Sequence, residues 1–205
     1  MSWTWSGDSN NVRQILSWAA ASNGSNLNIA SAKVPSKIRY RRGKPYAWGF
    51  NLEDTDTFDN ITFDWFKLIL DYDELPGGIK ASRRVQSTYA KLRKYGNGDP
   101  IETAVQVTAD YLRLLWNNVL EAIQEEMGQG WIDGLLCKVV ITKPAIWSQE
   151  ACSRTEQAAR MAIIPNKRPF RRIDLELIAE PEAAAHAVLG APEVILRPDL
   201  TKVTA

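Results

Sequence analysis

The chain contains little cysteine, little histidine and no long apolar run. Its 205 residues include two cysteines, Cys137 and Cys152, and one histidine, His186. Two cysteines are too few for a disulfide scaffold and are typical of a reducing compartment, and one histidine excludes the paired-histidine zinc motifs. No apolar stretch approaches the about 20 residues that span a bilayer, and the N-terminus does not resemble a secretory signal. These absences predict a cytoplasmic or nuclear protein with no membrane partner.

The chain also has almost no net charge. It carries 25 Lys and Arg residues against 24 Asp and Glu residues, for a net charge of +1, which argues against a nucleic-acid partner. Two short basic clusters, 41–44 and 167–172, carry no recognisable nucleic-acid fold signature, so that solvated loops are favoured over anion sites. Gly43 and Lys44 have no preceding glycine at phosphate-loop spacing. The common P-loop type of nucleotide site is therefore not predicted.

Sequence periodicity predicts an α/β protein with a mixed sheet flanked by helices. The strongest helix runs from Pro100 to Met127, between an acidic first turn and two glycines. Further helices are expected at 63–70, 148–162 and 181–189, and strands at 135–142 and 175–179. Hairpins are expected for 3–5 with 12–18 and for 37–41 with 46–50, and a loop at 19–31. Residues 72–98 are polar and rich in turn residues, which indicates a partly helical, mobile excursion.

Two strand-to-helix corners are the strongest candidates for a site. Pro144 follows the first predicted strand, and Glu180 and Pro181 follow the second. In open α/β sheets, ligands bind outside the carboxyl ends of the strands. Pro181 suits the first helical position and fixes Glu180 as an extended N-cap, where the helix dipole keeps a carboxylate ionised. Such a carboxylate suits hydrated magnesium, but the residues favour equally a plain helix cap.

Other chemistry-bearing residues have a structural interpretation. His186 lies in an Ala-rich helix, where packing or surface exposure is favoured over catalysis. Trp3 and Trp5 share one face of a predicted strand. Packing in the core or at an interface is favoured for them, and a sugar-binding platform is the alternative.

Five segments occur in a distinctive order. They are Val34-Pro35-Ser36, Trp48-Gly49-Phe50, Trp65-Phe66-Lys67-Leu68, the Pro144 corner and the Glu180 corner. Together they resemble the nucleotide-binding domain of the heat shock protein 70 family, in a divergent branch of actin-like ATPases. The resemblance implies an actin-like, ribonuclease-H-type fold. On this resemblance, residues 1–205 form part of the domain, namely its first lobe with subdomains IA and IB. Residues 72–99 are expected to be a flexible insertion within it.

The resemblance also implies a function in ATP-dependent chaperoning and stress response. Its cofactor is ATP or ADP with magnesium, and its partners are client proteins or co-chaperones. Lys67 matches the lysine that places the γ-phosphate and the attacking water, and Glu180 matches the carboxylate near the water shell of the metal. Pro144 matches the proline that senses the nucleotide state. Lysine, carboxylate and hydrated metal are the groups expected for phosphoryl transfer.

The sequence also departs from this family. The family's two phosphate-binding turns are not found, since the chain is expected to begin after the first and to stop before the second. Lys143 replaces the usual valine before the switch proline, and Cys152 replaces a basic residue. We therefore expect weak or absent ATP hydrolysis, and an aggregation-prone or partner-dependent chain. The alternative function is a non-enzymatic interaction module that keeps the lobe without its nucleotide cleft.

Overall fold

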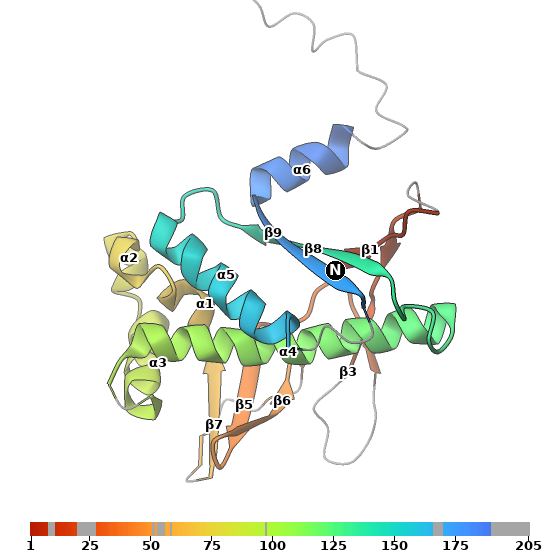
Figure 1. Cartoon of the computed structure of the whole chain (residues 1–205). Helices are drawn as coiled ribbons and strands as arrows, with labels where there is room; N and C mark the ends of the chain where they lie inside the picture. Colours follow the sequence, from red (N-terminus) through yellow and green to blue (C-terminus); the bar gives the residue numbers. More distant parts are fainter. Residues whose placement is uncertain are drawn as a thin grey trace, which may run out of the picture.

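The computed structural model describes residues 1–7, 11–19, 28–50, 52, 56–57, 59–96, 98–165 and 170–189. The protein has a mixed α/β fold, as the sequence predicted. A long helix, α4 (Pro100–Met127), crosses the molecule between an antiparallel sheet and a pair of parallel strands (Figure 1). In the described residues these strands form separate sheets, so the prediction of one mixed sheet is wrong.

The N-terminal strands form short antiparallel pairs. Strand β1 (Ser2–Trp3) pairs with β2 (Arg13–Gln14), and β3 (Ser17–Ala19) pairs with β4 (Asn28–Ala30). The first pair confirms the predicted hairpin, although residues 8–10 of its turn lie outside the described residues. Strand β4 corrects the prediction that 19–31 is all loop. Its residues hydrogen-bond to β3, a tertiary pairing that the Ser- and Asn-rich composition does not indicate.

A three-stranded antiparallel sheet follows, in the order β6-β5-β7. Strands β5 (Lys37–Arg41) and β6 (Lys44–Trp48) form the second predicted hairpin. Its turn is only Arg42 and Gly43, with φ of 49° and 77°, and two consecutive positive φ values are typical of tight hairpins. Strand β7 (Asn60–Asp64) pairs with the other edge of β5. The helix predicted at 63–70 is therefore reduced to α1 (Phe66–Ile69), after a left-handed Trp65.

Segment 72–99 is largely helical. It contains a 3-10 turn (Tyr72–Glu74), α2 (Gly77–Lys80) and α3 (Arg83–Tyr95), whose N-cap Ser82 accepts a hydrogen bond from the Val85 amide. Val85 and Leu92 are buried in the core, so that α3 is a packed part of the fold. The predicted flexibility of this segment stays a prediction.

The C-terminal elements form a parallel β-α-β unit and a last helix. They are β8 (Leu136–Lys143), α5 (Gln149–Ile163), β9 (Arg172–Ala179) and α6 (Glu180–Leu189). In β8 the side chains of Cys137, Val139 and Ile141 pack against the core, while Leu136 and Val140 are exposed. Strand β9 is three residues longer than predicted because Arg172 already pairs with Leu136.

Helix α4 forms the centre of the hydrophobic core. Its bounds match the prediction, and the Asp99 side chain caps it by accepting hydrogen bonds from the amides of Ile101 and Glu102. Aromatic rings from distant segments pack edge-on around it, among them Trp48 with Tyr111. None of the described helices is long and apolar enough to cross a membrane.

Candidate functional site

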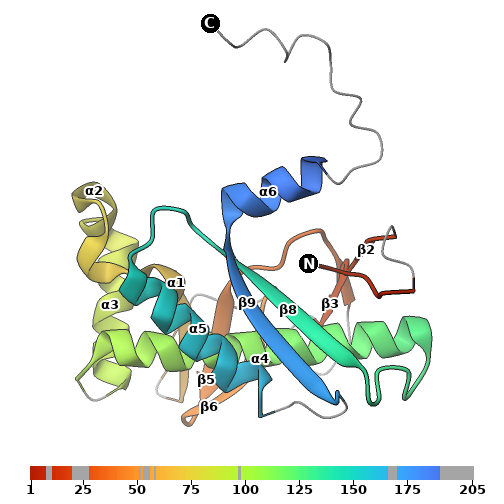
Figure 2. The same cartoon turned by 45° about the horizontal axis from the view of Figure 1, so that its top comes forward.

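The parallel pairing of β8 and β9 brings the two predicted corners together. The register pairs Lys143 with Ala179, so Pro144 and Glu180 directly follow the paired ends of β8 and β9. The two strands lie side by side in Figure 2. Helix α6 begins at Glu180, one residue before the predicted start. The first turn of this helix therefore starts directly at the carboxyl end of β9, at the position where α/β sheets bind ligands.

Lys67 reaches the same place from a distant part of the chain. Phe66 and Ile69 are buried and hold α1 against the core, while the Lys67 side chain is 45% exposed. Its Nζ atom lies 3.9 Å from Oε1 of Glu180, whose side chain is 55% exposed. A half-exposed pair of this kind contributes only about 0–1 kcal/mol to stability. The fold thus places a cation and a carboxylate side by side without depending on their attraction.

Trp147 is a third member of the site that sequence reasoning missed. The Lys67 Nζ atom lies 5.3 Å from the centre of its ring, within the range of a cation–π contact. The Trp147 ring is buried, and its backbone amide donates a 3.3 Å hydrogen bond to the Pro144 carbonyl. In the sequence, the position of Trp147 three residues after Pro144 is the only feature that associates it with the site.

Partly buried hydrogen bonds connect the loop after β8, and the helix that follows it, to the residues just after α1. The Ser148 hydroxyl donates to Oδ1 of Asp71 at 2.5 Å and accepts from the Ala151 amide at 3.1 Å, so that it also caps α5. Arg154 donates to the Leu70 carbonyl at 2.7 Å. These contacts fix the Pro144 corner relative to the helix that carries Lys67.

The corner offers one carboxylate, Glu180, as a possible metal donor. Glu180 is the carboxylate at the corner, and among the described residues no three His, Cys, Asp or Glu side chains gather as a metal cluster. Hydrated magnesium keeps several waters and needs one or two carboxylates. Glu180 therefore fits magnesium in its water shell better than a metal with several protein ligands.

The other candidate residues lie in structural contacts. His186 is exposed on α6. Trp3 and Trp5 pack edge-on against Trp131, with ring centres 6.1 and 5.7 Å away, which agrees with the packing interpretation. Arg42 pairs with Asp59 at 3.5 Å.

No protein-family model matches the chain, and no curated protein matches it.

Proposed function

We propose that the chain is a partial ATP-binding domain of a heat shock protein 70-like chaperone, with an actin-like fold. The observation that carries the proposal is the 3.9 Å contact between Lys67 and Glu180 beside Pro144. These are the three residues to which the family resemblance assigns roles at the nucleotide. ATP hydrolysis by these 205 residues is weak or absent, because the sequence shows neither phosphate-binding turn.

In this function the chain's own residues supply charge and position. The Lys67 ammonium leaves Glu180 to contact the γ-phosphate, and Glu180 would hold water of the shell of a bound magnesium ion. When bound, that ion would supply the positive charge that offsets the charge developing on the phosphates. A backbone hydrogen bond joins Trp147 to Pro144, so that a change at the phosphates reaches the Pro144 corner through the ring that contacts Lys67.

Calorimetric titration of the full chain with Mg-ATP and Mg-ADP tests this function. We expect Lys67→Ala and Glu180→Ala each to weaken ATP binding about tenfold or more, the loss typical of a charged hydrogen bond. Lys67→Ala should affect ADP less, because ADP has no γ-phosphate. The matched controls are Glu182→Ala, an exposed acid in the same turn of α6, and Lys94→Ala on α3. Absence of heat from ATP, or equal losses in the controls, would refute the proposal.

A second candidate, a non-enzymatic interaction module, is favoured by exposed apolar side chains. Leu136 and Val140 on β8 and Ile146 after it are 72%, 47% and 82% exposed. Leu136 and Val140 lie on the same face of β8, and exposed apolar patches mark protein contact surfaces. This function predicts concentration-dependent self-association that Mg-ATP does not change and that Val140→Lys reduces. Sedimentation showing a monomer at all concentrations would contradict it.

A further inference from the structure

A polar cavity of about 330 Å³ lies between β7 and α3, formed by residues other than Lys67 and Glu180. Its lining residues are Thr62, Asp64, Arg83, Arg84, Ser87, Thr88 and Lys91. The volume lies at the low end of the about 300–1,000 Å³ typical of ligand sites. Ligand sites are usually lined by apolar side chains, but every residue lining this cavity is polar or charged. Its shape and chemistry thus suit a small charged group.

The charges in the cavity leave two arginines for a ligand. Lys91 is neutralised by Asp56 at 2.7 Å and donates to the Thr62 carbonyl at 3.4 Å. Arg83 and Arg84 have no ion pair within the described part of the chain. Asp64 places one carboxylate in the lining of the cavity. The Thr88 hydroxyl lies 3.5 Å from Oδ1 of Asp64 and 3.1 Å from the backbone carbonyl oxygen of Asp64.

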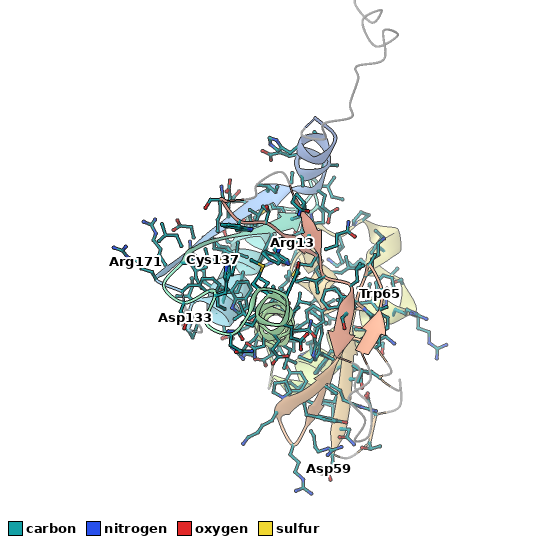
Figure 3. All side chains as sticks on the ribbon, turned by 90° about the vertical axis from the view of Figure 1, so that its right-hand side faces the viewer. Arg13, Asp59, Trp65, Asp133, Cys137 and Arg171 are labelled. Atoms are coloured by element: carbon teal, nitrogen blue, oxygen red, sulfur yellow. The ribbon has the colours of Figure 1, made fainter. Side chains whose placement is uncertain are left out.

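One of the arginines lies beside an aromatic ring. The Arg84 guanidinium lies 6.0 Å from the ring centre of Trp65. The Trp65 side chain, labelled in Figure 3, is 45% exposed. Trp65 adopts a left-handed conformation with φ of 56°, which is strained for a bulky residue. Strained residues of this kind concentrate at ligand clamps.

We propose that this cavity binds a phosphoryl group. Arginine forks bind phosphate oxygens in bidentate fashion, and a dianion satisfies both Arg83 and Arg84 while the Ser87 hydroxyl donates a further hydrogen bond. The group comes either from free phosphate or from a phosphate monoester. The site is independent of the proposed nucleotide function.

Calorimetric titration of the full chain with inorganic phosphate and with glycerol 2-phosphate tests the proposal. We expect both probes to bind, with an affinity that falls as salt is added. The substitutions Arg83→Gln and Arg84→Gln should each lower this affinity about tenfold. Binding of the ester indicates a phosphorylated ligand, and binding of phosphate alone indicates the free ion. Arg93→Gln is the control, since this exposed arginine on α3 does not line the cavity.

Three outcomes would overturn the proposal. They are no heat from either probe, equal losses in Arg93→Gln, and loss of the heat in Lys67→Ala, which would assign phosphate binding to the other site. Circular dichroism of each variant checks that it is folded. Arg84→Lys, which keeps the charge without the fork, should bind more weakly than the natural chain and more tightly than Arg84→Gln.

Discussion

Replacing Ser148 by alanine should destabilise the protein more than the loss of a helix cap explains. The Ser148 hydroxyl caps α5 and also donates to the Asp71 carboxylate. Asp71 is only 4% exposed, so water cannot readily replace the lost donor. The substitution therefore removes two interactions at once, at the loop that joins the Pro144 corner to α1.

The expected size follows from the two contacts. Loss of a serine cap costs about 0.5–2 kcal/mol, and loss of a hydrogen bond to a charged group costs about 1.5–3 kcal/mol. Their sum, about 2–5 kcal/mol, is a large part of the about 5–15 kcal/mol by which a typical domain is stable. In a chain of this size the melting temperature should fall by about 4–20 °C.

Urea unfolding and thermal melts of Ser148→Ala measure the effect, with Ser82→Ala as the matched control. Ser82 caps α3 through the Val85 amide at 3.4 Å and has no buried carboxylate partner. The control should lose only about 1 kcal/mol. Ser148→Ala and Asp71→Ala should also combine with less than additive cost, because each removes the same hydrogen bond. Equal losses for Ser148→Ala and Ser82→Ala, or strict additivity in the double variant, would refute the reasoning.

Three further predictions concern single contacts. Trp147→Leu should weaken Mg-ATP binding several-fold and Trp147→Phe much less, because phenylalanine keeps a ring face for Lys67; equal effects in titration would contradict a cation–π contact. Tyr40→Phe should lower the free energy of unfolding in urea by about 1.5–3 kcal/mol, because it removes a buried 2.7 Å hydrogen bond to the Asp110 carboxylate. Burial raises the pKa of the Cys137 thiol from 9.0 to about 11. The folded state then binds this proton more tightly than the unfolded state, so stability should fall as pH rises from about 9 to about 11. Denaturant melts of Cys137→Ala should show a smaller fall across this range, and an unchanged fall would exclude the thiol as a cause.

Helices with local signals at both ends could be predicted from the sequence. Helix α4 has Asp99 as its cap, Pro100 at its first position and Gly128 after its last residue, with φ of 97° at the glycine. Helix α5 begins directly after its cap Ser148, which is the first residue of the predicted helix. These signals act within a few residues of each helix end, so that they do not require knowledge of the rest of the fold.

Elements that depend on pairing between distant segments could not be predicted in the same way. Residues 63–70 have an apolar content that suits a helix, but Phe63 and Asp64 hydrogen-bond to β5 as the end of β7. Strand β4 exists only as the partner of β3. In both segments a tertiary hydrogen-bond ladder outweighs local propensity.

The candidate site could be predicted from the sequence only where its residues carry a local signal. The two corners are visible in the sequence because proline and a carboxylate mark the ends of strands. Lys67 followed only from the family resemblance, since a lysine on a four-residue helix carries no local signal. The Trp147 contact could not be found, because it depends on how α1 packs against the loop after β8.

Stability and function should separate at this site. The contact between Lys67 and Glu180 is half-exposed and contributes about 0–1 kcal/mol, so it cannot hold the site together. The geometry comes from the partly buried hydrogen bonds of Ser148 with Asp71 and of Arg154 with the Leu70 carbonyl. Substitutions of the charged pair should therefore leave the melting temperature nearly unchanged, whereas substitutions in the partly buried contacts should lower it and displace Lys67 as well. A loss of ligand binding without a loss of stability thus identifies residues that contact the ligand.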